Sequence, residues 1–283
     1  MAIDINSAQF LVAARKNGIS FDRAVMIGRQ NLCVALPLLV QLFERNKLSS
    51  ERLTIPTTSR YSEPLFEALG AKQVDSLDNS DFEGAQLVHD MNQPIRAEWR
   101  EKYDIVYDGG TLEHIFNFPT ALKNSMELVR EGGRLFIHTC ANNLCGHGFF
   151  QFSPELFYRA LSAENGFEVE RMSIHRAGPY GAWYEVSDPN AIRSRVELIT
   201  FTPVLIMVQA KRVSIKPIFS QPPQQSDYTA LWQSSAHPVA SRPPKNNFPV
   251  LRSFYGALRT GLEFYHRQSL FNRRFFRRNS RKD

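Results

Sequence analysis

The sequence predicts an α/β fold built on a doubly wound, mostly parallel sheet of about seven strands with an antiparallel edge. The main observation is that two short apolar runs, at 105–107 and 135–137, flank a helical pattern that ends at Gly132. A strand, a helix and a strand in that order form a βαβ unit, which requires parallel strands and a right-handed crossover. Two late apolar runs, at 167–174 and 203–210, have only a loop between them, which predicts the antiparallel edge.

The chain before this unit also alternates strands and helices. Pro37 lies within one of the helical patterns, and proline is tolerated there only in the first turn or at a kink. Several of the expected strands end at a glycine or an acidic residue. Polar groups are therefore expected at the carboxyl edge of the sheet, where ligands bind in such folds. The expected elements are a helix at 7–16, a strand at 23–27 closing at Gly28, helices at 32–44 and 63–69, and strands at 73–77 and 86–89 ending at Asp78 and Asp90.

After the central unit, Ser153-Pro154-Glu155 has the residues of a helix start. The serine can cap the helix, the proline fits its first position, and the acid favours its first turn. We expect that helix to run to about residue 162.

The chain divides into an α/β domain at 1–215, a Pro/Ser/Gln-rich linker at 216–248 and a basic amphipathic helix and tail at 249–283. Residues 251–283 carry nine of the 34 Lys and Arg and two of the 28 Asp and Glu, so 1–250 is nearly neutral. The basic tail has three readings: a solvated terminus, contact with an anionic membrane surface, or contact with a nucleic-acid backbone. The sequence contains no nucleic-acid module, so nucleic acid is the least favoured partner.

Composition limits the class of protein. A hydrophobic content of 43% fits a folded globular chain, and the longest apolar run, 32–43, is about half of what a bilayer crossing needs. Three cysteines give no disulfide framework. No N-terminal run resembles a signal peptide, so the expected location is the cytoplasm, with peripheral membrane contact through the tail as an extension.

The turn at Gly28 does not fit a dinucleotide. A pyrophosphate site needs the pattern G-x-G-x-x-G, and only the first glycine is present, because Gln30 stands at the second position. The first acid that ends a second strand is Asp78, much later than the usual ribose-binding acid. A nicotinamide or flavin role is therefore disfavoured.

The order of Gly28, Asp78, Asp90, the run YDIVYDGGTLEH at 103–114 and the run VREGGRLFIHT at 129–139 resembles class I S-adenosylmethionine-dependent methyltransferases. The resemblance covers about 20–212 and implies a Rossmann-like fold. It implies that Gly28 lies against the methionine part of S-adenosyl-L-methionine, that Asp78 holds the ribose hydroxyls and that Asp90 lies near the adenine amino group. It also implies that Asp108 and Gly109, after the fourth strand, face the methyl group and the acceptor.

Two departures from that family concern the glycine turn. Gln30 and Leu32 replace loop glycines, and Met26 replaces the acid that usually precedes the first glycine. Because the cofactor carries no phosphate, these losses do less harm than they would to a dinucleotide site. They nevertheless motivate an alternative, a catalytically decayed methyltransferase-like binding or scaffold protein.

The candidate catalytic residues are His147, Glu113 and His114. A hydroxyl acceptor needs a base, and His147 lies between glycines in a loop at a strand's carboxyl end, where a side chain titrating near neutral pH is useful. The expected acceptor is therefore a small molecule or a sugar or glycan hydroxyl. Each candidate also has a structural reading: Asp78 and Asp90 as turn residues, and His114 as a packing residue.

A zinc site is a further alternative. His138, Cys140, Cys145 and His147 follow the pattern H-x-C-x4-C-x-H, whose ligand types suit tetrahedral zinc. The spacing matches no established zinc module, so the primary prediction contains no metal.

Overall fold

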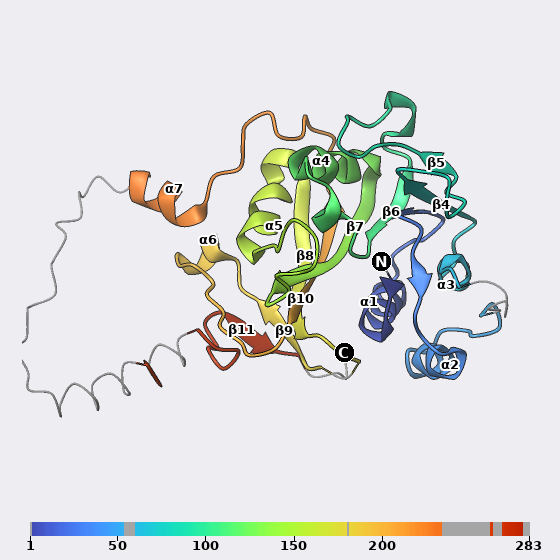
Figure 1. Cartoon of the computed structure of the whole chain (residues 1–283), viewed down its shortest axis with the longest axis horizontal. Coiled ribbons are helices and arrows are strands. Elements are labelled where there is room, and N and C mark those ends of the chain that lie inside the picture. The colour runs from blue at the N-terminus through green and yellow to red at the C-terminus, as the bar shows by residue number, and fades with distance from the viewer. Residues whose placement is uncertain (1, 54–59, 180, 234–260, 263–267, 280–283) are drawn as a thin grey trace, which may run out of the picture.

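The computed structural model describes residues 2–53, 60–179, 181–233, 261–262 and 268–279, and Figure 1 shows one large sheet running through them. Five strands at one side of the sheet are parallel and four at the other side are antiparallel. The order is β11 (Phe276–Arg278), β9 (Trp183–Val186), β8 (Phe167–Arg176), β10 (Val204–Arg212), β7 (Val129–Asn142), β6 (Tyr103–Asp108), β2 (Arg23–Ile27), β4 (Gln73–Asp78) and β5 (Leu87–Val88). The predicted fold class is confirmed, but the sheet has nine strands instead of seven.

Helices cover both faces of the sheet, because alternate strand residues point to opposite sides. In β2, Val25 and Ile27 face the cluster that contains α4 (Phe118–Leu128) and α5 (Pro154–Ala160), whereas Ala24 and Met26 face the other cluster. That second cluster contains α1 (Ile5–Lys16), α2 (Leu36–Arg45) and α3 (Glu63–Ala68). The result is a three-layer molecule with two apolar cores.

The helix starts follow local chemistry. The Asp4 carboxylate caps α1 by accepting a hydrogen bond from the Ser7 amide at 2.8 Å, and Ser153 caps α5 by accepting from the Leu156 amide, as predicted. The predicted helix at 32–44 instead begins at 36, so that Pro37 lies in its first turn. Asn31–Leu32 forms the short strand β3, which pairs in parallel with β1 (Ala2–Ile3).

The sequence predicts a helix end and a turn at Gly132; helix α4 ends at Leu128, and Gly132, with a φ of +80°, lies in an irregularity of the β6–β7 pairing instead of in a separate turn. Strand β7 begins at residue 129 and continues through both glycines. A Cβ on Gly133 would lie 2.8 Å from the Tyr103 carbonyl oxygen, so the glycine permits β6 and β7 to approach closely.

Two corrections concern the C-terminal part. Residues 226–233, predicted as linker, form helix α7 (Ser226–Gln233), whose first residue donates its backbone N–H and its hydroxyl to Glu155. Residues 276–278, predicted within a basic helix, form strand β11, and Phe276 is 2% exposed in the core. A short helix α6 (Pro189–Ile192) lies between β9 and β10. Residues 249–260 lie outside the described part.

Within the described ranges, no helix is both long enough and apolar enough to cross a bilayer. Three phenylalanines lie among the arginines of the tail, where they could have added apolar contact with a membrane; Phe271 is 73% exposed, whereas Phe275 and Phe276 are buried. Peripheral membrane contact and a cytoplasmic location stay predictions.

Candidate functional site

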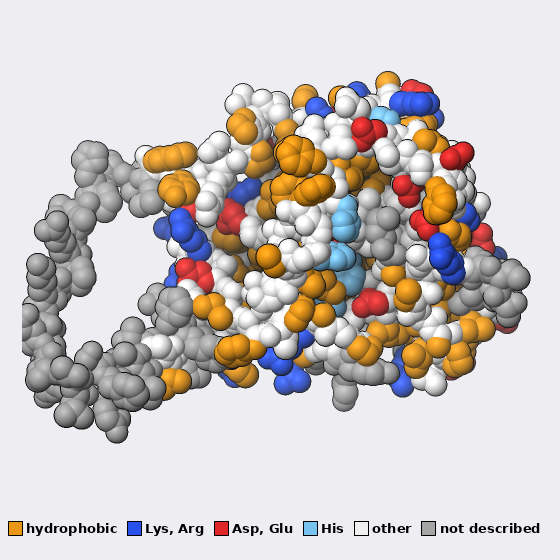
Figure 2. All heavy atoms as spheres, viewed as in Figure 1, with side chains coloured by type: hydrophobic (Ala, Val, Ile, Leu, Met, Phe, Trp, Pro, Cys, Tyr) orange, Lys and Arg blue, Asp and Glu red, His pale blue; other side chains and the backbone are white. Residues whose placement is uncertain are grey.

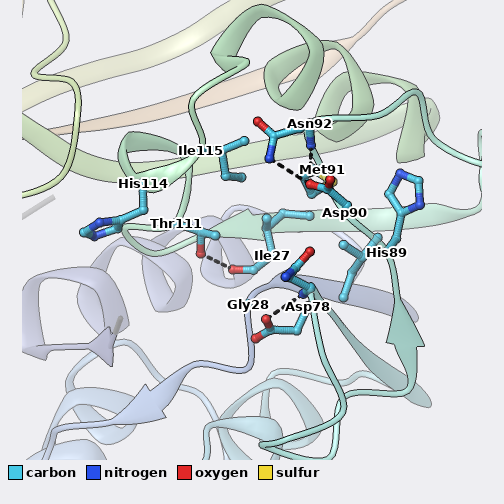
Figure 3. A pocket seen from close by; sticks show the side chains of 12 residues that line it. Ile27, Gly28, Asp78, His89, Asp90, Met91, Asn92, Thr111, His114 and Ile115 are labelled. Carbon is cyan, nitrogen blue, oxygen red and sulfur yellow. Dashed lines mark hydrogen bonds between the residues drawn. The ribbon is translucent and has the colours of Figure 1, made fainter.

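A cavity of about 550 Å³ lies at the carboxyl ends of β2, β4, β5 and β6. This is the edge where ligands bind in doubly wound sheets, and the volume suits a small-molecule site. Figure 3 shows Asp78 and the Asp90–Asn92 turn around Ile27, with His114 and His89 at opposite ends. The lining residues are Ile27, Gly28, Leu77, Asp78, Asn79, His89, Asp90, Met91, Asn92, Thr111, His114 and Ile115.

The turn after β2 is tied to its neighbours. Gly28 has a φ of +71°, a conformation that favours glycine, and its amide donates to the Leu77 carbonyl at 2.7 Å. Thr111 donates its hydroxyl to the Ile27 carbonyl at 2.6 Å, which joins the loops after β2 and β6. The hydrogen bonds of Gly28 and Thr111 therefore fix the backbone that forms this wall of the pocket.

Two carboxylates from successive strand ends line the same cavity. Asp78 Oδ1 accepts from the Asn79 amide at 2.7 Å. Asp90 Oδ1 accepts from the backbone and side-chain nitrogens of Asn92 at 2.9 and 2.8 Å, and these bonds lower the pKa of Asp90. Both residues line the cavity, so their carboxyl oxygens are available to a bound ligand.

The donor and acceptor set fits a nucleoside. Ile27, Leu77, Met91 and Ile115 give apolar walls, and the two carboxylates supply acceptors for hydroxyl or amino hydrogens. The resemblance noted in the sequence places ribose hydroxyls at Asp78 and an adenine amino group at Asp90, and that placement is compatible with one continuous cavity. Neither Met26 nor Arg29 is among the lining residues; Arg29 instead pairs with Glu63 at 2.7 Å.

Asp108 and Gly109 do not line the cavity, which differs from the expectation that they face the methyl group. Asp108 is fully buried, and its Oδ1 accepts from the amides of Thr111 and Leu112 at 3.0 and 3.3 Å. Burial, together with the charge of Glu113, raises the pKa of Asp108 well above its usual range. Asp108 therefore shapes the loop that carries Glu113 and His114.

The three candidate catalytic side chains lie together. Glu113, 1% exposed, accepts from the Thr139 hydroxyl through Oε2 at 2.8 Å, and its Oε1 lies 3.5 Å from His147 Nε2. The His114 and His147 rings have centroids 5.0 Å apart. Since His114 also lines the cavity, the cluster lies at the mouth of the pocket.

Exposed aromatic rings border this cluster. Phe116 and Phe149 are 75% and 66% exposed, and their rings meet edge to face at 5.8 Å. In Figure 2, histidine side chains lie next to large hydrophobic ones in the middle of the face. Such rings offer a flat apolar contact to an acceptor molecule.

The structure does not assemble the H-x-C-x4-C-x-H zinc pattern. His138 is buried between Ser7 and His175, at 2.5 and 2.9 Å, whereas His147 faces Glu113. Cys140 donates to the Phe150 carbonyl, and Cys145 is exposed. The four side chains therefore do not share one site.

Sequence reasoning missed three polar residues that line the pocket, Asn92, Thr111 and His89, and the role of the buried Gln30 in the turn after β2. Asn92 and Thr111 each follow a strand-end acid by two or three residues, a spacing that could have indicated them as turn residues. The Gln30 side chain is buried and donates to the Ile27 carbonyl at 2.7 Å, while its Oε1 has no partner. No pattern in the sequence indicates that arrangement.

No protein-family profile matches the chain, and no curated protein matches it. Solved structures do match. The N-methyltransferase NodS from Bradyrhizobium japonicum is 12% identical, with 74% of this chain and 96% of that chain covered and a TM-score of 0.39. A didemethyltoxoflavin N1-methyltransferase from Burkholderia thailandensis, with bound S-adenosylhomocysteine, is 12% identical over 74% and 79% of the chains, with a TM-score of 0.40. Likeness at this level carries no argument about what this chain binds, so the geometry of the pocket must support the assignment.

Proposed function

We propose that this chain is an S-adenosylmethionine-dependent methyltransferase that modifies a hydroxyl group of a small molecule or a sugar or glycan. The observation that carries the proposal is one cavity with two carboxylates at successive strand ends and a Glu-His-His cluster at its mouth. A nucleoside-binding half and a polar half with titratable groups thus adjoin each other on one sheet edge.

On the cofactor side, Asp78 would accept from the ribose hydroxyls, and Asp90 with Asn92 would contact the amino edge of adenine. Ile27, Met91 and Ile115 would exclude water from the base. When bound, S-adenosylmethionine supplies a methyl group on a positively charged sulfur, and the acceptor oxygen gains that methyl as the carbon–sulfur bond breaks.

On the acceptor side, the cluster of Glu113, His114 and His147 would hold the acceptor hydroxyl and take up its proton. Phe116 and Phe149 would position the acceptor by stacking against an apolar face, as the flat side of a sugar ring provides. This combination favours a hydroxyl acceptor with an apolar surface.

Isothermal titration of the purified full chain with S-adenosylmethionine and S-adenosylhomocysteine tests the cofactor half. We expect saturable binding of both, and a folded protein that binds neither would exclude this function. A labelled-methyl screen over sugars, glycans and small phenols, with amines as a comparison set, tests the acceptor half. Transfer to amines alone would contradict the hydroxyl assignment.

A second candidate is a methyltransferase-like protein without catalysis, which the position of Gln30 favours. Its buried side chain packs against Gly109, where a Cβ would lie 2.6 Å from Gln30 Oε1. Where the resemblance expects a second loop glycine, this chain therefore has a buried polar side chain. This candidate predicts weak or absent cofactor binding and an unchanged biological role in Asp78→Ala.

A further inference from the structure

Three metal-ligating side chains converge at the mouth of the pocket. Among the described residues, Glu113, His114 and His147 form the one group of at least three such side chains whose ligand atoms all lie within 4.8 Å of one another. Two imidazoles and one carboxylate are the ligand set of many catalytic metal sites.

Glu113 is arranged as a ligand would be. Its Oε2 accepts from the Thr139 hydroxyl at 2.8 Å, which orients the carboxylate and leaves Oε1 toward His147 Nε2 at 3.5 Å. Tetrahedral zinc at 2.0–2.2 Å from its ligands sets neighbouring ligand atoms about 3.4 Å apart. The observed separation of these two atoms is already close to that value.

Backbone contacts hold the two histidines on either side of this carboxylate. His114 follows Glu113 directly in a 3-10 turn, and the loop bearing His147 is fixed by the Phe149 amide, which donates to the Glu113 carbonyl at 2.8 Å. Gly148 has a φ of +73° and leaves no room for a Cβ beside that same carbonyl. Both histidine side chains are exposed, so solvent and not packed protein borders them.

The surroundings favour a cation with an open coordination position. The Glu113 carboxyl is buried whereas both histidines are exposed, so the three side chains reach from the interior of the loop region to its surface. Imidazole ligands suit zinc and related transition metals, whereas magnesium prefers oxygen ligands and water. The solvent-facing side of His114 and His147 leaves at least one position for an acceptor oxygen or water.

We propose that Glu113, His114 and His147 bind one divalent transition-metal ion of the zinc type. The ion's role rests on the proposed function: as a Lewis acid it would lower the pKa of a bound acceptor hydroxyl, whose proton would pass to water in place of uptake by the cluster, because side chains that hold the metal cannot also accept it. The binding site itself does not, because its residues and geometry stand without a cofactor or an acceptor.

The test is calorimetric titration of the metal-stripped full chain with zinc chloride, and separately with magnesium chloride, in the absence of S-adenosylmethionine. We expect one zinc site and far weaker binding of magnesium. His147→Ala and His114→Ala should each weaken zinc binding at least about tenfold. Cys145→Ser is the matched control: this exposed thiol lies in the same loop, and its loss should leave zinc binding unchanged.

Two outcomes would overturn the site: folded wild-type protein that binds no zinc, or zinc binding that both histidine variants leave intact. Glu113→Gln is a further test. Because Glu113 is buried, circular dichroism of this variant must first show that it is folded. A parallel titration with S-adenosylhomocysteine separates the two proposals. Wild-type protein that binds S-adenosylhomocysteine but no zinc would refute the metal site alone. Wild-type protein that binds zinc but no S-adenosylhomocysteine would refute the proposed function alone.

Discussion

Gly148 packs against the backbone of Glu113: a Cβ built on Gly148 would lie 2.7 Å from the Glu113 carbonyl oxygen. The loop that carries His147 is therefore seated on the residue that His147 faces. The position of one glycine decides how close the histidine comes to the carboxylate.

Gly148→Ala should displace this loop, because the new methyl group meets backbone and the φ of +73° disfavours any side chain. We expect zinc affinity and methyl transfer to fall at least about tenfold with little loss of global stability, since the loop is exposed. Gly146→Ala is the matched control, because a Cβ there meets nothing within 4 Å. Equal affinities in the two variants would show that the loop is not held as described.

Asp78→Ala should weaken binding of S-adenosylhomocysteine by about 10- to 100-fold, because two charge-assisted hydrogen bonds are lost. Asp81→Ala, three residues on and outside the cavity lining, should leave binding unchanged. Calorimetry with both variants distinguishes two roles of the Asp78 carboxylate: binding the ligand, or only stabilising the turn through its hydrogen bond with the Asn79 amide. A wild-type affinity of Asp78→Ala for S-adenosylhomocysteine would show that Asp78 stabilises only the turn.

Gly109→Ala should destabilise the fold by about 1–3 kcal/mol, because the new Cβ would lie 2.6 Å from Gln30 Oε1 and 2.8 Å from the Tyr107 ring. Shortening Gln30 should relieve part of this cost. In a double-mutant cycle measured by urea unfolding, Gln30→Ala and Gly109→Ala should therefore be non-additive. Additive effects would mean that the two residues do not compete for the same space.

The sequence was sufficient for the fold class and for the position of the pocket, though not for the number of strands, because strand-end residues such as Gly28, Asp78 and Asp90 follow directly from the βα pattern. It was insufficient for Asp108, which has the same strand-end position. That carboxyl points into the loop because the amides of Thr111 and Leu112 donate hydrogen bonds to it. A residue pattern does not show whether a strand-end carboxyl bonds to its own loop or faces a ligand.

The convergence of Glu113 and His147 also lay beyond a residue pattern. The two residues are on different loops, and their approach depends on the backbone contact at Gly148. The C-terminal strand was missed for a related reason. Phe275 and Phe276 lie among arginines and resemble an amphipathic surface segment. Pairing of residues 276–278 with the edge of β9 is what makes this segment a strand, with both phenylalanines buried.

Stability should depend on pH through His138. Burial, with a smaller effect of His175, lowers the pKa of His138 from 6.5 to about 4. His138 therefore takes up a proton below about pH 6.5 in the unfolded chain, but only near pH 4 in the folded chain. The free energy of unfolding is consequently highest above pH 6.5 and decreases as the pH falls from 6.5 to 4. The decrease is on the order of 3 kcal/mol. Urea unfolding between pH 4.5 and 7 would detect it, and His138→Gln should flatten the slope; an unchanged slope would assign the effect to other groups.

Phe276→Ala should lower the free energy of unfolding by about 3 kcal/mol, because the ring is 2% exposed within the core that the sheet shares with α4 and α5. Phe271→Ala is the matched control: its ring is 73% exposed, so the change should stay within about 0.5 kcal/mol. Arg277→Ala removes an exposed ion pair with Glu185 and should also have a small effect. If both phenylalanine variants unfolded at the wild-type urea midpoint, β11 would not be docked on β9 in solution, and the basic tail would again be free to act as the sequence suggested.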